Sequence, residues 1–143
     1  MDTVALRFSD NFAPEIGTIG AHEELIKKYG FVWYGKLGLP LSDKMVDVLM
    51  KNEIKKILLI KSGKAERYWL YFDAIEKKVP ESKHIPAYYR KKAADFKTWF
   101  RTVKIEVAPN DIMSKCYVKS SGAVLSNASR HSMSPYFIIT TEE

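Results

Sequence analysis

The stretch Ile57–Ile75, with the sequence ILLIKSGKAERYWLYFDAI, decides the fold. It begins with a continuous apolar run, typical of a strand that is buried on both faces, and a turn containing Gly63 follows, where a positive φ is often required. The second strand, Arg67–Ile75, has rings on both faces, because side chains alternate along a strand. Tyr68, Leu70 and Phe72 share one face, and Trp69, Tyr71 and Asp73 share the other. We expect one set of rings to enter the core and the other to be available for binding.

Helices are predicted on the N-terminal side of this hairpin from capping residues and apolar spacing. Thr18 is a candidate N-cap of a helix that runs to about Tyr29, and Ser42 is a candidate N-cap of a helix that runs to about Asn52. Gly30 follows the first helix, at a position where a left-handed residue commonly ends a helix. Residues 1–14 are predicted to form an edge strand or an ordered arm.

Short strands and loops are predicted for the rest of the chain. The other predicted strands are Phe31–Lys36, Lys97–Val107, Cys116–Val118 and Pro135–Thr141. The proline-containing stretch 77–90 and the polar stretch 120–134 are predicted to be loops, and 109–114 a helical turn. Because strands and helices do not alternate regularly, the pattern predicts a mixed α+β domain, with a small curved sheet or barrel and flanking helices.

The composition indicates one cytosolic domain. The chain has 143 residues, of which 46% are hydrophobic and 28% are charged, and this length suits one core. No apolar run reaches the roughly 18 residues of a membrane span, and no basic-then-apolar leader begins the sequence. The single cysteine, Cys116, excludes an internal disulfide and is expected to be a buried apolar side chain. We therefore predict a cytoplasmic location and no membrane partner.

The charge and the aromatic content favour nucleic acid as a partner. The formal net charge is +6, and 13% of the residues are aromatic. Lys and Arg bind phosphates with release of counterions, and aromatic rings stack on bases. Since many unrelated proteins are basic, these two features alone do not identify the ligand.

Motifs for catalysis are incomplete in this sequence. Lys61–Lys64 has only the second half of a phosphate-binding loop, and the histidines have no Cys or acidic partner at metal-ligand spacing. Ser121 and His131 are not set in a nucleophile elbow. The Glu76–Lys78 triplet resembles the Glu-x-Lys motif of metal-dependent nucleases, but it lacks an evident acidic partner. We predict a protein that is not an enzyme and that has no metal or cofactor, with such a nuclease as the enzymatic alternative.

Aromatic residues on three predicted strands are candidates for a base-binding cage. They are Trp33, Tyr34, Trp69, Tyr71, Trp99 and Phe100. Indole faces bind bases and methylated groups through stacking and cation–π attraction, and an extruded base needs such a slot. A single Trp is more often a core residue. The case is strongest for Trp33, because its neighbours Gly35 and Lys36 suit the mouth of a ligand site.

Short motifs in a shared order resemble those of the YTH and EVE domains of the PUA-like superfamily. The motifs are Val32-Trp33 after a helix, the run Ile57–Ile60, the turn Ser62–Lys64, and the strands Arg67–Ile75 and Trp99–Glu106. The resemblance spans most of 31–139, which we expect to be the PUA-like core of a single domain, 1–143. Residues 1–30 are expected to be an N-terminal arm and helix without a clear counterpart.

This resemblance implies a reader of modified nucleobases, and it implies roles for individual residues. YTH-like members read N6-methyladenine, EVE-like members read modified cytosine, and similar domains occur in modification-dependent restriction systems. Trp33 matches the first wall of the cage, and Trp69 or Tyr88 is expected to close it. Tyr34 and Ser62 are expected to read the edge of the base or to donate from the backbone. The complete predicted cage is Trp33, Tyr34, Trp69, Tyr88, Trp99 and Ser62.

The predicted partner is nucleic acid, DNA more than RNA, with a fused or separate effector nuclease or NTPase. The side chains expected to contact its backbone are Lys36, Lys61, Lys64, Arg67, Arg90, Arg130 and His131. The alternative function is a protein- or nucleotide-binding interaction module or inhibitor in a defence system. A nucleic-acid reader needs a basic rim around the aromatic cleft, whereas a peptide binder does not.

Overall fold

The Ile57–Ile75 stretch forms the antiparallel pair β3 (Lys56–Lys61) and β4 (Arg67–Glu76) in the computed structural model, which describes residues 1–142. Leu58 pairs with Trp69 and Leu59 with Tyr68, so Tyr68 and Trp69 lie on opposite faces as predicted. Gly63 adopts a φ of 69° in the turn between the two strands. The predicted hairpin is therefore confirmed.

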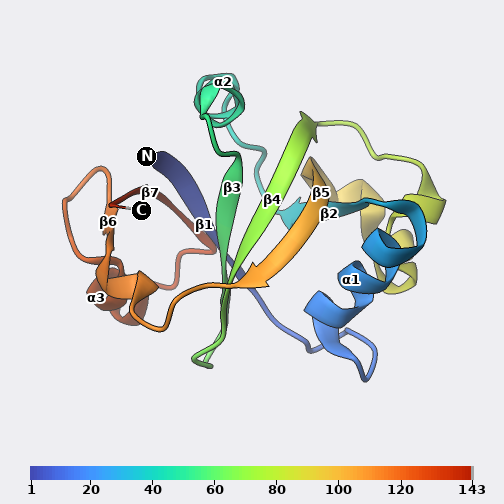
Figure 1. Cartoon of the computed structure of the whole chain (residues 1–143), viewed down its shortest axis with the longest axis horizontal. Helices are drawn as coiled ribbons and strands as arrows, with labels where there is room; N and C mark the ends of the chain where they lie inside the picture. Colours follow the sequence, from blue (N-terminus) through green and yellow to red (C-terminus); the bar gives the residue numbers. More distant parts are fainter. Residues whose placement is uncertain (143) are drawn as a thin grey trace.

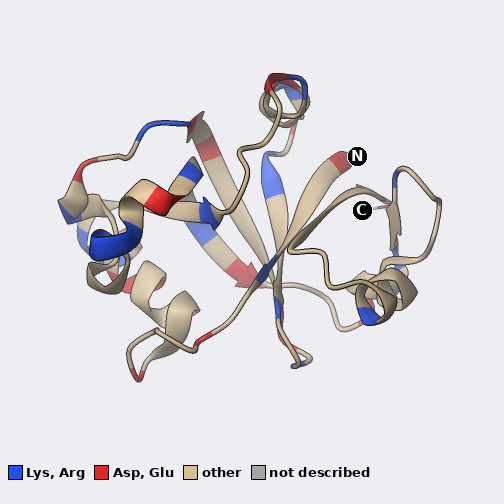
Figure 2. Ribbon diagram, turned by 180° about the vertical axis from the view of Figure 1, so that it is seen from behind, with Lys and Arg blue, Asp and Glu red and all other residues tan. Residues whose placement is uncertain are grey.

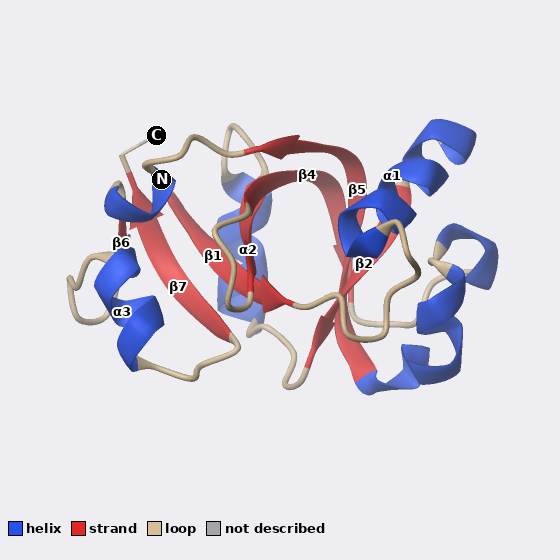
Figure 3. Ribbon diagram, turned by 90° about the horizontal axis from the view of Figure 1, so that it is seen from below, coloured by secondary structure: helices blue, strands red, loops and turns tan. Residues whose placement is uncertain are grey.

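Within residues 1–142 the strands form one mixed sheet (Figure 1). The remaining strands are β1 (Asp2–Phe8), β2 (Val32–Leu37), β5 (Phe96–Val107), β6 (Cys116–Val118) and β7 (Tyr136–Thr141). Their order is β2-β5-β4-β3-β1-β7-β6, and only the β1–β3 pair is parallel. Figure 3 shows β4 and β5 strongly bent. The bend coincides with register shifts on either side of Phe72, as expected of β-bulges. The predicted α+β class with a curved sheet is confirmed.

Both faces of the hairpin are buried, and each belongs to a separate hydrophobic core. The first core contains Leu59, Leu70 and Phe72, and Tyr68 packs against it. The second core, on the opposite face, contains Trp69, which is only 1% exposed. The expectation that one set of rings is available for binding is wrong for this strand. The second face is covered because residues from β6, β7 and the segment 108–125 pack on it.

The first strand is not an edge strand or an arm. β1 pairs with β3 on one side and with β7 on the other, and Val4 and Ala5 are fully buried. Thr3 also donates its hydroxyl to the Lys56 carbonyl, at 2.6 Å. A central strand is buried on both faces, which explains why its apolar residues are consecutive and do not alternate.

Helices lie at the ends and sides of the sheet. The α-helices are α1 (Gly17–Tyr29), α2 (Asp43–Lys51) and α3 (Leu125–His131), and the short 3-10 helices are η1 (Ser82–His84), η2 (Ala87–Asp95) and η3 (Ile112–Ser114). Ser42 caps α2 as predicted, accepting from the Met45 N–H at 3.1 Å, and Gly30 ends α1 with a φ of 86°. The loop predictions for 77–90 and 120–134 are wrong where η1, η2 and α3 form. In α3 only Leu125 is buried, so the sequence carries little apolar signal for a helix there.

A third hydrophobic cluster lies where η2 packs against β5. It consists of Ile85, Ala93, Phe96 and Trp99, with Trp33 and Tyr89 packed against it, and we call it the Trp99 cluster. Trp99 is 0% exposed and donates its indole N–H to the Phe96 carbonyl at 3.1 Å. Gly35 lies directly under these rings, because a Cβ there would be 3.0 Å from atoms of both Phe96 and Trp99. In residues 1–142, no helix has the length and apolar character needed to cross a membrane.

Candidate functional site

A polar hollow opens where β1 leads into α1. Its volume is about 180 Å³. The lining residues come from the end of β1, the start of α1 and the β3–β4 hairpin, and they are Phe8, Asp10, Glu15, Ile16, Gly17, Thr18, Ile19, Lys61, Glu66 and Tyr68. The hollow is smaller than the roughly 300–1,000 Å³ of a typical pocket for a drug-sized ligand. Its size therefore suits a small planar or branched group.

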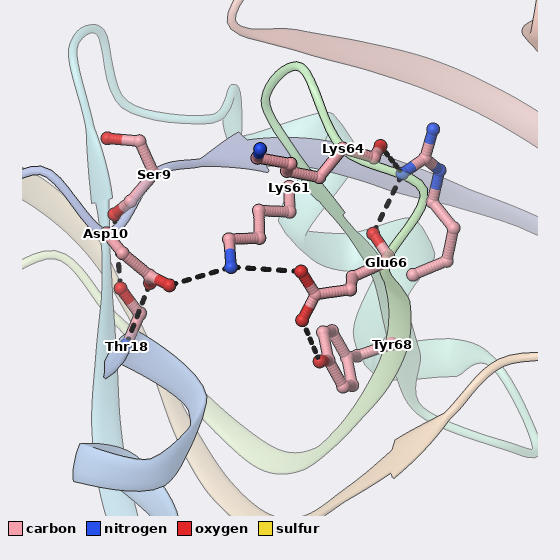
Figure 4. Close-up of polar contacts among 8 residues, drawn as sticks. Ser9, Asp10, Thr18, Lys61, Lys64, Glu66 and Tyr68 are labelled. Carbon is pink, nitrogen blue, oxygen red and sulfur yellow. Dashed lines mark hydrogen bonds and ion pairs between the residues drawn. The ribbon is translucent and has the colours of Figure 1, made fainter. Parts of the chain in front are cut away.

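Charged side chains cross this hollow in one connected network (Figure 4). The Lys61 ammonium lies 2.9 Å from Asp10 and 2.9 Å from Glu66. Asp10 accepts from the Thr18 backbone N–H at 2.9 Å, which supplies a cap to the first turn of α1 from outside the helix. Glu66 accepts from the Tyr68 hydroxyl at 2.9 Å. The network ties the β1–α1 loop to the β3–β4 hairpin.

The network keeps both carboxylates ionised. Burial acts to raise the pKa of Asp10, but the Lys61 ammonium and the hydrogen bonds from Thr18 outweigh it, so the pKa is lowered. Lys61 and then the Tyr68 hydroxyl lower the pKa of Glu66. The hydrogen bonds to Asp10 and Glu66 in turn raise the pKa of Lys61. The hollow therefore presents acceptor-only oxygens to any N–H group that enters it.

His22 lies one helical turn after Thr18, in a fully buried position. Its Nδ1 is 2.7 Å from the Thr18 carbonyl oxygen, which can only accept, so Nδ1 carries the proton. Burial lowers the pKa of His22 to about 4, and the ring is neutral at pH 7. Nε2 is then an acceptor, and it meets no hydrogen-bond partner among the residues that the structure describes.

Tyrosine rings surround His22. Its ring centroid is 5.0 Å from that of Tyr34 on β2 and 5.4 Å from that of Tyr89 on η2, and the Tyr88 ring is 4.5 Å from Tyr89. Burial is the main cause that raises the pKa values of all three tyrosines, so their hydroxyls stay protonated. The Tyr88 hydroxyl is buried and, within residues 1–142, makes no hydrogen bond of acceptable geometry. We call His22, Tyr34, Tyr88 and Tyr89 the His22 cluster.

A second hollow lies on the other side of the β1–α1 loop. It has a volume of about 610 Å³ and shares Glu15 and Ile16 with the first. Tyr88 lines it, together with the exposed ring of Phe12. The β1–α1 loop therefore lines both hollows. Of the His22 cluster, Tyr88 lines the second hollow, and His22 bonds to the backbone of Thr18, which lines the first.

The structure divides the predicted cage residues among several places. Tyr34 is in the first core, Trp69 in the second and Trp99 in the third cluster, each at most 3% exposed. Trp33 is partly buried against the Trp99 cluster, together with Tyr89, so this pair and Trp99 are brought together. Ser62 is exposed in the β3–β4 turn, where its N–H donates to the Phe8 carbonyl at 2.8 Å.

The predicted basic residues are also spread over separate elements (Figure 2). Lys36 is only 4% exposed, and its ammonium donates to the carbonyls of Leu37 and Leu39 and lies 4.4 Å from the centre of the Tyr136 ring. Lys61 belongs to the network described above. The others lie on the β3–β4 turn, at the start of β4, on η2 and on α3, and they are Lys64, Arg67, Arg90, Arg130 and His131.

Sequence reasoning missed Asp10 and His22 as candidate functional residues. The only signal for Asp10 was its place directly after an apolar strand. His22 looked like a lone histidine, although its i, i+4 spacing from Thr18 places both on the same side of a helix.

The fold is a curled mixed sheet with a polar hollow at one end. A family model described as Pua-like matches residues 4–141, which is nearly the whole chain. The chain therefore belongs to the Pua-like family, and the predicted PUA-like resemblance is confirmed. Neither the comparison with curated proteins nor that with solved structures gave a match. Domains of this family are generally binding domains, and membership suggests a nucleic-acid-binding module.

Proposed function

We propose that this domain binds nucleic acid and receives an extruded, modified base at the His22 cluster. The observation that carries the proposal is the buried His22 Nε2, an acceptor without a partner among residues 1–142, packed against Tyr34 and Tyr89 in a cluster whose Tyr88 lines the second hollow. A buried acceptor that stays unpaired costs about 1–3 kcal/mol. A ligand that donates an N–H to this atom would remove that cost.

The chemistry of the cluster matches the edge of an aminated base. N6-methyladenine and modified cytosine both carry an exocyclic N–H, which can donate to His22 Nε2 or to the Asp10 carboxylate. The Tyr88 hydroxyl can donate to a ring nitrogen of the base. The rings of Trp33, Tyr88 and Tyr89 supply stacking surfaces and room for a methyl group. Since the cluster is closed in the free protein, Tyr88 and the β1–α1 loop must move when the base enters.

Affinity depends on phosphate contacts as well as on the base. Extruding a base costs a few kcal/mol, and stacking returns about 1–3 kcal/mol per aromatic contact. The remaining stabilisation comes from exposed basic side chains such as Lys64, Arg90 and Arg130, so binding weakens as salt is raised. The proposed ligand is DNA rather than RNA, and a fused or separate nuclease or NTPase is the proposed effector.

The test is fluorescence anisotropy with short oligonucleotides, in DNA and RNA, with and without N6-methyladenine or 5-methylcytosine. We expect one modified oligonucleotide to bind at least tenfold more tightly than its unmodified match. Tyr88→Phe removes only a hydroxyl that makes no hydrogen bond of acceptable geometry within residues 1–142, so we expect nearly unchanged folding and a roughly 5- to 10-fold weaker affinity for the modified oligonucleotide, the size of one hydrogen bond. Tyr29→Phe is the matched control at the exposed end of α1.

The outcomes separate the possible functions. Equal binding of modified and unmodified oligonucleotides would reduce the function to general nucleic-acid binding. Binding to none of them at low salt would overturn the proposal. In that case the second hollow, which combines exposed apolar Phe12 and Ile16 with Glu15 and Glu24, would favour a basic, partly apolar peptide as the ligand.

A further inference from the structure

Two arginines lie on the same face of the sheet, on strands that flank β3. Arg7 on β1 pairs with Ile60, and Ile60 pairs with Arg67 on β4. Residues paired across neighbouring strands project to the same face. The guanidinium groups of Arg7 and Arg67 therefore stand on either side of Ile60.

Both arginines are held by carbonyl groups. Arg7 donates to the carbonyls of Ser129, Ser132 and Ser134, at 2.6, 2.9 and 2.9 Å, and so holds the end of α3 and the segment after it. Arg67 donates through one terminal nitrogen to the carbonyls of Lys64 and Glu66, at 2.6 and 2.8 Å. Its Nε is buried and has no partner among the residues that the structure describes.

Among the residues that the structure describes, no carboxylate forms an ion pair with either arginine. Among residues 1–142, the ion pairs within 4.0 Å do not include Arg7 or Arg67, and the nearby Glu66 carboxylate is engaged by Lys61 and Tyr68. Burial, and then the positive charge of Arg7, lower the pKa of Arg67. Two like charges that repel each other in a partly desolvated place are costly, and an anion bound between them relieves that cost.

We infer that Arg7 and Arg67 form a binding site for a phosphate group. Among residues 1–142, Arg7 and Arg67 each keep one terminal nitrogen without a carbonyl contact, so both can donate to the oxygens of one phosphate, and the carbonyl contacts hold the two side chains in place before the ligand arrives. Arg130 and His131, at the end of α3, belong to the segment that Arg7 anchors, and Lys64 belongs to the turn that Arg67 anchors. Of these side chains, Arg130 and Lys64 add positive charge near the pair.

The site lies at the same end of the sheet as the polar hollow, on the opposite face. In the β3–β4 hairpin, Lys61 belongs to the hollow and Arg67 to the phosphate site. In the same way, Arg7 of the phosphate site precedes Asp10 of the hollow by three residues. The inference rests in part on the proposed function. A nucleic-acid strand that places a base in the hollow can also place a phosphate of its backbone against the two arginines. The same chemistry also accepts free phosphate.

The first measurement is oligonucleotide affinity as a function of salt. We expect Arg67→Gln to bind about tenfold more weakly, with or without the modified base, and to lower the slope of log Kd against log salt by about 1, the value for one lost phosphate contact. Arg67→Lys, which keeps the charge, should retain the slope and lose less affinity. Lys44→Gln, an exposed change on α2 at the opposite end of the sheet (Figure 1), should change neither quantity.

The second measurement is the thermal shift with inorganic phosphate alone. We expect phosphate to raise the Tm of the wild type and of Lys44→Gln, but not that of Arg67→Gln. If Arg67→Gln leaves both the salt slope and the phosphate shift unchanged, the inference is overturned, while a preference of the wild type for a modified oligonucleotide would still support the proposed function. If no oligonucleotide binds but phosphate stabilises through Arg67, the proposed function fails and the site is one for free phosphate.

Discussion

Replacing Trp99 by alanine is expected to lower the free energy of unfolding by about 3–5 kcal/mol, the usual cost of truncating a fully buried large aromatic side chain. Trp99 is 0% exposed and its indole N–H is bonded to the Phe96 carbonyl, so the variant leaves both a cavity and an unpaired carbonyl. This loss is a large part of the 5–15 kcal/mol stability of an ordinary domain. Urea denaturation followed by circular dichroism measures it directly.

Two further variants show whether the loss comes from packing. Trp33→Ala should lower the free energy of unfolding clearly less than Trp99→Ala does, because Trp33 is only partly buried at the margin of the same cluster. Gly35→Ala should destabilise the wild type, since its Cβ would press on the Trp99 ring, but it should be better tolerated in the Trp99→Ala background. A stable Trp99→Ala protein that has lost its preference for a modified oligonucleotide would instead place Trp99 in the base cage.

Acidification is expected to destabilise the protein through His22. The pKa of His22 is about 4 in the folded protein, because burial disfavours the charged ring, against an ordinary value of 6.5. Between these values the unfolded chain binds a proton that the folded protein does not bind, so stability falls as the pH falls. The contribution is fully present above pH 6.5 and is lost by about pH 4, and it amounts to about 3 kcal/mol.

His22→Leu isolates this contribution. The groups that face His22 are the Thr18 carbonyl and the neutral tyrosines, so no neighbouring charge should take over its titration. We expect the variant to be within about 1 kcal/mol of the wild type at pH 7 and to lose less stability between pH 7 and pH 4.5. Carboxylates with lowered pKa values, such as Asp10, titrate in both proteins and cancel in the difference. If the variant loses as much stability between pH 7 and pH 4.5 as the wild type does, His22 is not the source of the acid destabilisation.

The strands of this fold were largely predictable because their apolar patterns are strong. The hairpin at 57–75 and the strand at 116–118 appear where the sequence places them. The arrangement of β1 was not predictable, since its neighbours β3 and β7 come from distant parts of the chain. Helix α3 was missed because one buried leucine in a polar segment gives no amphipathic period.

The candidate site was less predictable than the fold. The sequence shows many aromatic residues but not which of them are accessible. Trp69 is buried in the second core, whereas Tyr88 lines a hollow. The significance of His22 depends on a missing partner for one ring nitrogen, which is a property of the packed structure. From the sequence alone, Lys36 resembles an ordinary surface charge. In the structure it is buried, and its ammonium contacts two backbone carbonyls and the Tyr136 ring.

The central position of β1 has a consequence for how the chain acquires its structure. β1 precedes both of its neighbouring strands in the chain: Thr3 bonds to Lys56, 53 positions later, and Asp2 pairs with Thr140 near the other end of the sequence. Closing such long loops before any contact is gained slows folding. During translation, β1 emerges before β3 and long before β7, so Val4 and Leu6 lie on a strand that still lacks its second neighbour. Such an unpaired apolar strand is prone to aggregation, so this protein should depend on slow elongation or on chaperones more than its size suggests.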